Sequence, residues 1–169
     1  VSGNFTYGID LSDGGSAALR RTACKGNGNG GCRVLGQGSI LAVCDSTFSG
    51  NSYCGIWAQS GSSTTLTRTA FSGNRGYGCR VYDKGSSLVV SDSTVSGNGD
   101  RGFDVRWQSS VALTRVACTN NRGGNVVEES GGRVLHLALP CNYGLLGVCP
   151  ANSRNLDVVA VDTCWKVVL

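Results

Sequence analysis

The chain has little of what metal sites and membrane anchors require. Its 169 residues include one histidine, His136, and no two cysteines are separated by two residues, which argues against a zinc site. No run of eighteen apolar residues occurs, so we expect no membrane insertion by this segment. There is also no methionine, and the first residues already match the internal repeat described below. We therefore expect a processed chain or part of a longer protein.

Charge is sparse and scattered. The net charge of +4 comes from fifteen basic and eleven acidic residues, and no dense basic run occurs. Nucleic-acid-binding proteins concentrate basic residues on one face, so we expect no nucleic-acid partner. No motif for a cofactor is present either. A hydrophobic fraction of 40% in a chain of this length fits a single folded domain.

The dominant feature of the chain is a repeat. Six asparagines lie 23 or 24 residues apart, each within a similar block of sequence: Asn4, Asn27, Asn51, Asn74, Asn98 and Asn121. A glycine follows four residues after each of the first five, whereas Asn125 takes that place in the sixth block. Asparagine and glycine tolerate turn conformations, so each cluster marks a bend. Blocks stacked in register would let the asparagine amides hydrogen-bond from block to block as a ladder.

Short alternating segments follow each bend. The first set spans residues 9–11, 32–34, 56–58, 79–81 and 103–105, and the second spans 40–43, 64–67, 88–90 and 111–114. A third apolar position precedes each asparagine by three residues, at Cys24, Phe48, Phe71, Val95 and Cys118. Alternation with period two indicates strands with one buried face, and no helical pattern occurs. We predict an all-β, right-handed parallel β-helix of five to six coils, each rising about 4.8 Å.

The repeat weakens after Arg122. Cys141 keeps the 23-residue step from Cys118, which suggests one further coil. We therefore predict β-helix repeats over 1–141 and a cysteine-containing cap, or the start of a following domain, over 142–169. A cap is expected physically, because a bare solenoid end exposes core and unpaired strand edges.

Two motifs resemble a known family. Phe48-Ser49-Gly50-Asn51 and Phe71-Ser72-Gly73-Asn74 match the FxxN signature of polymorphic outer membrane protein repeats, and Gly30-Gly31-Cys32 resembles their GGA[I/L] signature. More broadly, the coils resemble the β-helix repeats of pectate-lyase-like proteins over about residues 1–130. Such repeats occur in adhesins, autotransporter passengers, surface coats and polysaccharide enzymes, so the resemblance implies the fold and leaves these functions open.

Nine cysteines favour an oxidising compartment, and hence an extracellular or cell-surface location. Cys118 and Cys141 are neighbours by register and can form a disulfide. Cys32 and Cys79 are two coils apart, about 9.6 Å by strand spacing, which is too far for a bond. We interpret Cys24, Cys32 and Cys79 as small apolar core residues.

Two outward columns carry charge. The first, six residues after each asparagine, reads Asp10, Arg33, Trp57, Arg80 and Asp104; Asp10 can pair with Arg33, Arg80 with Asp104, and Trp57 would lie between two guanidinium groups. The second, six residues before each asparagine, alternates in sign: Arg21, Asp45, Arg68, Asp92 and Arg115. Like charges stacked about 5 Å apart would repel, so we interpret the second column as a ladder that fixes the register of the coils.

A cluster of polar and aromatic residues is the candidate site: Trp57, Arg80, Tyr82, Asp83, Asp104, Arg106 and Trp107. We expect them on the outer face of one strand stack, where aromatic rings and charged groups suit a glycan or a protein partner. The alternative is a purely structural ladder of cross-strand pairs. A third hypothesis is a polysaccharide lyase or hydrolase acting on acidic glycans through Asp83 and Asp104 with Arg80 or Arg106.

The predicted function is a non-catalytic extracellular or cell-surface module. We expect a rigid β-helix spacer in a larger assembly, filamentous or glycosylated, that contacts glycans or other subunits. Other subunits or further chain would cover the open coil ends. Asn4-Phe5-Thr6 is a candidate glycosylation sequon, unless Asn4 points inward like the other ladder asparagines.

Overall fold

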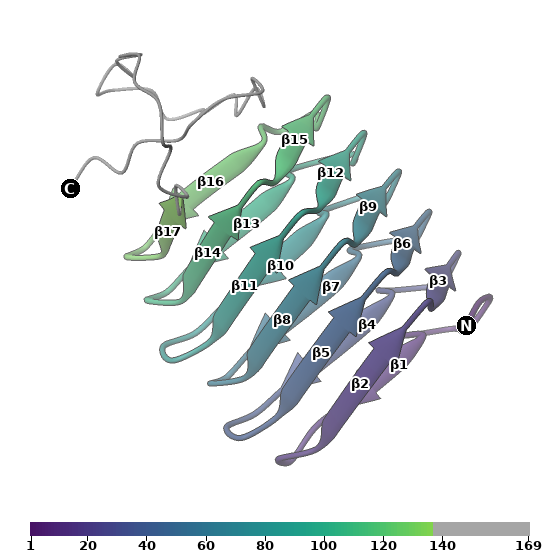
Figure 1. Ribbon diagram of the computed structural model, residues 1–169, viewed down its shortest axis with the longest axis horizontal. Coiled ribbons are helices and arrows are strands. Elements are labelled where there is room, and N and C mark those ends of the chain that lie inside the picture. Colours follow the sequence, from purple (N-terminus) through teal and green to yellow (C-terminus); the bar gives the residue numbers. More distant parts are fainter. Residues whose placement is uncertain (137–169) are drawn as a thin grey trace, which may run out of the picture.

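The protein is a stack of six right-handed β-coils (Figure 1). The computed structural model describes residues 1–136, and the predicted all-β parallel β-helix is confirmed there. Cys141 and the region 142–169, for which we predicted a cap or a following domain, lie outside the described residues. No helix occurs among residues 1–136, and in particular none long and apolar enough to cross a membrane.

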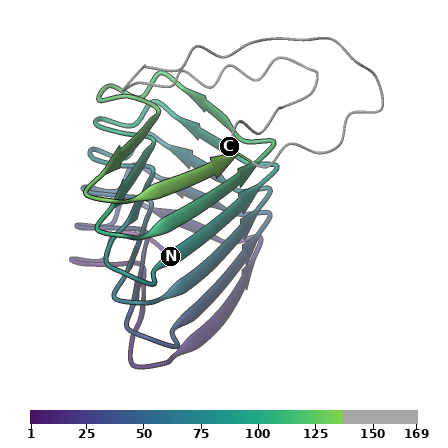
Figure 2. The same ribbon diagram turned by 90° about the vertical axis from the view of Figure 1, so that its left-hand side faces the viewer.

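Three parallel sheets run along the stack (Figures 1 and 2). Sheet 1 contains β1 (Ile9–Leu11), β4 (Cys32–Leu35), β7 (Ile56–Gln59), β10 (Cys79–Val81), β13 (Phe103–Arg106) and β16 (Val126–Glu129). Sheet 2 contains β2 (Ser16–Arg20), β5 (Ile40–Cys44), β8 (Ser63–Thr67), β11 (Ser87–Ser91), β14 (Ser110–Thr114) and β17 (Arg133–His136). Sheet 3 contains β3 (Ala23–Lys25), β6 (Thr47–Ser49), β9 (Ala70–Ser72), β12 (Thr94–Ser96) and β15 (Ala117–Thr119).

Alternation along each strand produces the core. In β5, for example, Leu41 and Val43 point inward and are buried, whereas Ile40 and Ala42 face solvent. The inward side chains of the three sheets meet in one continuous column that runs the length of the stack. Within it the Phe48 and Phe71 rings stack at a centroid distance of 5.2 Å. Because each coil cannot bury its apolar face alone, the coils stabilise one another by stacking.

The asparagine ladder is continuous. Each Nδ2 donates to Oδ1 of the asparagine in the next coil at 2.8–2.9 Å, from Asn4 to Asn27 and onward to Asn121. The same Oδ1 accepts the backbone N–H of the preceding asparagine at 3.1–3.2 Å. In the sixth coil, Asn121 Nδ2 donates to Oδ1 of Asn125 at 2.9 Å. Asn125 therefore supplies the acceptor that a further asparagine would provide.

The cysteines of the core are single thiols. Four of them are buried and form no disulfide: Cys24, Cys32, Cys54 and Cys79. This agrees with our interpretation of the first, second and fourth as small apolar core residues. Burial raises the pKa of the Cys118 thiol to about 12. The predicted Cys118–Cys141 disulfide stays a prediction, because Cys141 lies outside the described residues. In residues 1–136, cysteine content therefore gives no support to an oxidising compartment.

Candidate ligand-binding site

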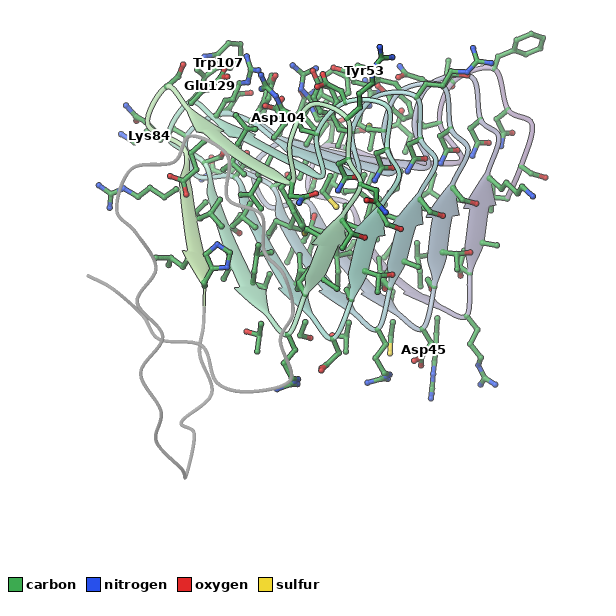
Figure 3. All side chains as sticks on the ribbon, turned by 90° about the horizontal axis from the view of Figure 1, so that it is seen from above. Asp45, Tyr53, Lys84, Asp104, Trp107 and Glu129 are labelled. Carbon is green, nitrogen blue, oxygen red and sulfur yellow. The ribbon has the colours of Figure 1, made fainter. Side chains whose placement is uncertain are left out.

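One side of the solenoid differs from the other two. Every tyrosine and tryptophan among residues 1–136 lies in a strand of sheet 1 or in a loop beside it: Tyr7, Tyr53, Trp57, Tyr77, Tyr82 and Trp107. The outward residues of sheets 2 and 3 are mostly serine, threonine and alanine. Figure 3 shows Tyr53, Asp104 and Trp107 along one edge of the stack and Asp45 on the opposite edge. The candidate site therefore lies on sheet 1.

Arg80 of β10 is enclosed by aromatic rings. Its guanidinium carbon lies near four ring centroids, at 3.9 Å from Tyr82, 4.8 Å from Tyr77, 5.3 Å from Tyr53 and 5.7 Å from Trp57. Partial burial lowers the pKa of Arg80, and the nearby Asp104 carboxylate opposes that shift. The cation stacks on π faces, an arrangement that stabilises a partly desolvated guanidinium. Arg80 thus contacts aromatic residues of two neighbouring coils.

Asp104 of β13 is the centre of the ionic network. Its carboxylate is fully buried and accepts hydrogen bonds from Tyr82 Oη at 3.0 Å and from Arg80 Nε at 3.1 Å. Arg101 and Arg106 donate to its other oxygen at 2.6 and 2.8 Å. We predicted Asp104 on an outer face, and its position in β13 does point outward. The long side chains around it, however, exclude it from solvent.

Glu129 of β16 completes the network. Its carboxylate, 41% exposed, pairs with Arg101 at 3.1 Å and with Arg106 at 3.0 Å. Glu128 occupies the inward register beside Val105 and accepts the backbone N–H of Val134. Asp104, Glu128 and Glu129 therefore do not converge on a common point where they could bind a cation, because arginines lie between Asp104 and Glu129. No group of three potential metal ligands occurs among residues 1–136.

Trp107 is the exposed member of the cluster. Its side chain is 52% exposed, and its ring lies against that of Tyr82 at a centroid distance of 4.9 Å. Trp107 and Gln108 adopt φ values of 53° and 61°, in the left-handed region. Side chains with a Cβ are disfavoured in this region by about 1–3 kcal/mol each. The turn after β13 is therefore strained.

The chain matches one known family. The sequence model of the family described as "Right handed beta helix region" matches residues 1–134. This chain is a member of that family. None of the curated proteins and none of the solved structures is significantly similar to it. The narrower resemblance to polymorphic outer membrane protein repeats stays a prediction.

In this β-helix protein, several predicted residues do not form the expected contacts. Asp83 lies in the turn after β10 and accepts a hydrogen bond from Ser60, so it does not pair with Asp104 as two catalytic carboxylates would. Tyr82 is buried beneath Trp107 instead of exposed. We predicted Trp57 between two guanidinium groups, but only Arg80 of this column contacts its ring. Arg33 lies instead over the Tyr7 ring, at 4.9 Å from its centroid. Loop residues Tyr7 and Trp107 contact Arg33 and Tyr82, whereas Asp83 faces the turn of the preceding coil because it lies outside the strand.

The remaining pairs of the first charged column form in the expected register. Asp10 aligns with Arg33 and bonds to it at 2.7 Å, and Arg80 aligns with Asp104. The Asp10–Arg33 pair is part-exposed, in contrast to the buried Asp104 network, so its contribution to stability is small.

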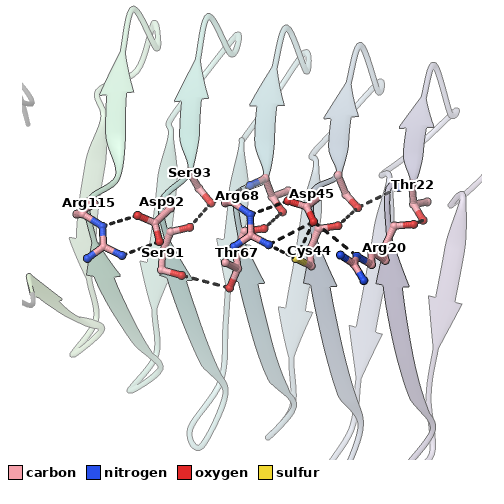
Figure 4. Close-up of polar contacts among 12 residues, drawn as sticks. Arg20, Thr22, Cys44, Asp45, Thr67, Arg68, Ser91, Asp92, Ser93 and Arg115 are labelled. Atoms are coloured by element: carbon pink, nitrogen blue, oxygen red, sulfur yellow. Dashed lines mark hydrogen bonds and ion pairs between the residues drawn. The ribbon is translucent and has the colours of Figure 1, made fainter.

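The second charged column lies at the bend between sheets 2 and 3 (Figure 4). Asp45 pairs with Arg68 at 2.6 Å, and Asp92 pairs with Arg115. Hydrogen bonds from Arg68 and then Cys44 lower the Asp45 pKa to about 2. Arg20 instead of Arg21 approaches Asp45, at 3.7 Å. Arg21 shares the left-handed bend conformation of the other members of this column, with a φ of 50°, but Arg20 takes the place beside Asp45 that we predicted for it.

Sequence reasoning missed Tyr7, Tyr53, Tyr77 and Arg101. Tyr7, Tyr77 and Arg101 all stand three residues after a ladder asparagine, so a column was present in the repeat. The same position holds Gly30 in the second coil and Cys54 in the third, where Tyr53 comes one residue earlier. These exceptions made the column of aromatic residues hard to recognise in the sequence.

Asn4 lies at the exposed end of the ladder. Its Nδ2, the atom to which a glycan would attach, donates to Asn27 Oδ1 at 2.9 Å. Modification would break that hydrogen bond, and glycosylation of Asn4 stays a prediction.

Proposed function

We propose that this β-helix protein is a non-catalytic interaction module that presents sheet 1 to its partner. The observation that carries the proposal is the confinement of all described tyrosines and tryptophans to that sheet and its flanking loops. Aromatic residues and arginine dominate the energetics of recognition surfaces. Sheets 2 and 3, whose outward side chains are mostly short and uncharged, serve as scaffold.

The ionic network supports a binding role over a catalytic one. A glycoside hydrolase needs one carboxylic acid that keeps its proton and a second carboxylate nearby. Asp104 is buried among Arg80, Arg101 and Arg106, and neighbouring guanidinium groups favour the charged form of a carboxylate. Asp83 points to Ser60 instead. No observation on residues 1–136 therefore favours the alternative, a polysaccharide lyase or hydrolase.

The rest of the molecule suits a rigid spacer. Backbone hydrogen bonds, the asparagine ladder and the pairs Asp45–Arg68 and Asp92–Arg115 all join one coil to the next. Each added contact resists bending between coils, so the face of sheet 1 keeps its geometry when the module is held at one end. We propose that the module belongs to a larger extracellular or cell-surface assembly with glycans or other subunits.

The first coil has an open side. Its inward residues Ile9, Leu11, Ala17 and Leu19 are only partly buried, and β1 and β2 have no further strand beside them in residues 1–136. Residues 1–3 pair with β3 through backbone hydrogen bonds. Open edges of this kind attract additional strands. We propose that further chain or another subunit covers this end.

One assay separates the interaction module from an enzyme. The protein is run in native gels that contain single polysaccharides, neutral or acidic, and each mixture is also assayed for new reducing ends and for unsaturated uronate products. The expected result is retardation by at least one polysaccharide without product. Product formation by the wild-type protein would overturn the proposal in favour of catalysis.

A further inference from the structure

We propose that Trp107 is the anchor of a binding site for a neutral pyranose unit of a glycan. This inference rests on the proposed function of sheet 1 as a contact face, and it adds the residue that makes the contact and the class of ligand. The site consists of Trp107, Tyr82, Arg106, Arg101 and Glu129.

The first observation is the strain in the turn that presents Trp107. Equivalent turns in other coils place glycine at the second left-handed position, as in Ser60-Gly61 and Ser130-Gly131. In the fifth coil, Trp107-Gln108 holds both left-handed positions with no glycine. Strained backbone persists where the surrounding structure enforces it and is concentrated at functional sites. The turn thus departs from the repeat at the point where the chain exposes its largest side chain.

The second observation is that the Trp107 ring is held in place. Tyr82 lies against it at 4.9 Å, and the Arg80 guanidinium lies at 3.9 Å from the Tyr82 ring centroid. Tyr82 is fixed in turn by its hydrogen bond to Asp104. A ring held this way loses little conformational freedom on binding. Its exposed area offers the flat apolar surface on which the C–H face of a sugar ring packs.

The third observation concerns the ionic network next to Tyr82, which Arg106 approaches at 5.9 Å from the ring centroid. Arg106 and Arg101 each pair with both Asp104 and Glu129, so neither guanidinium lacks a carboxylate partner. A uronic acid or a sulfated sugar would have to displace Glu129 to gain an arginine. Neutral hydroxyl groups need no such exchange, since they can donate to the part-exposed Glu129 and accept from the guanidinium edges. The ion pairs therefore favour a neutral sugar.

The fourth observation is the small size of the apolar area. The other large hydrophobic residues that are strongly exposed in residues 1–136 lie elsewhere: Val1 and Phe5 before β1, and Ile40, Val89 and Leu135 on sheet 2. A stable protein interface buries about 800 Å² on each partner around several anchors. A single exposed tryptophan with flanking polar groups suits a sugar ring better than a protein surface.

The test variant replaces the strained turn by that of another coil. Trp107→Ser combined with Gln108→Gly reproduces the Ser60-Gly61 turn, and Val89→Ala on sheet 2 is the control for loss of an exposed apolar side chain. Dissociation constants are measured by calorimetry for cellohexaose, mannohexaose, laminarihexaose and hexagalacturonate. Urea unfolding of each variant and sedimentation velocity are recorded alongside.

We expect at least one neutral hexasaccharide to bind the wild-type protein more tightly than hexagalacturonate does. The turn variant should bind that hexasaccharide at least tenfold more weakly while unfolding at the same or a higher urea concentration, and the control should bind like wild type. A purely structural Trp107 predicts the opposite, a less stable variant with unchanged affinity, and that result would overturn the proposal while leaving the proposed function intact.

Three other outcomes also overturn it. Tighter binding of hexagalacturonate that is lost in Lys84→Ala, in the exposed neighbouring turn, would show an acidic ligand. Self-association of the wild type that the turn variant abolishes would show that Trp107 contacts another subunit. Failure of the wild type to bind any of the four hexasaccharides would remove the glycan ligand altogether.

Discussion

Tyr82 donates its hydroxyl hydrogen to Asp104 Oδ2 across 3.0 Å and so joins the turn after β10 to the middle of β13. The bond links the aromatic cluster to the ionic network, because Tyr82 contacts the rings and Asp104 contacts the arginines. Tyr82 and Asp104, which lie in neighbouring coils, therefore both help to position the exposed Trp107: Tyr82 contacts its ring, and Asp104 fixes Tyr82.

Asp104→Asn should destabilise the protein strongly. The change leaves Arg80, Arg101 and Arg106 without the buried charge that they share, and removal of one partner from a buried ionic group costs about 3 kcal/mol or more. Asp10→Asn is the matched control, since it breaks an exposed pair in the same sheet for less than about 1 kcal/mol. Urea unfolding measures both. Equal losses would show that burial of Asp104 contributes nothing.

Asn74→Ala should lower the free energy of unfolding by about 3 kcal/mol, because it leaves the backbone N–H and one of the two Nδ2 hydrogens of Asn51 without an acceptor in the core. Asn4→Ala removes only the Nδ2 donor at the exposed end of the same ladder and should cost less than about 1 kcal/mol. Thermal and urea unfolding compare the two variants. A ladder that is only a consequence of coil stacking would give similar small losses at both positions.

The Asp45–Arg68 pair predicts a defined dependence on acid. Hydrogen bonds from Arg68 and Cys44 hold the Asp45 pKa at about 2, below its ordinary value of 3.8. A lowered carboxyl pKa stabilises the fold fully above the unfolded value, and this contribution is lost as pH falls through the folded value. The difference in melting temperature between wild type and Asp45→Asn should therefore shrink between pH 4 and pH 2. A constant difference across that range would contradict this account.

Thiol reactivity should follow burial. Cys24, Cys32, Cys54 and Cys79 are fully buried, whereas Cys44 is partly exposed on sheet 2. An alkylating reagent applied to the native protein should therefore modify Cys44 before these four, and Cys44→Ser should remove that early phase. Peptide mapping without reductant would then show whether Cys118 and Cys141 are joined, as predicted. Early modification of Cys32 or Cys79 would show that the coils open readily.

The fold was predictable because two periods coincide in this sequence. The 23–24-residue period aligns the coils, and alternation within each coil assigns every strand residue to the core or to the surface. Together they predict pairs such as Asp10 with Arg33 in the observed register. Few other stacking arrangements satisfy both periods, so the sequence was sufficient without knowledge of the loops.

The candidate site was only partly predictable for a physical reason. Alternation places Asp104 and Arg106 on the outward face of β13 but says nothing of Arg101, which reaches Asp104 from the bend before the strand. Tyr53 and Tyr77 lie in bends, where side-chain direction no longer follows period two. The structure is needed wherever burial is produced by long side chains and loops instead of by the strand itself.

The uniform coils make the length of this molecule adjustable by gene rearrangement. In-frame duplication of two units, for example residues 28–74, would insert two coils between the Asp10–Arg33 pair and the Asp104 network while preserving the asparagine ladder and the alternating signs of the second charged column. Each such event would move the Trp107 surface about 9.6 Å farther from the first coil and turn it slightly about the axis. Natural variants of different reach could thus arise without any change to the residues that would meet a ligand.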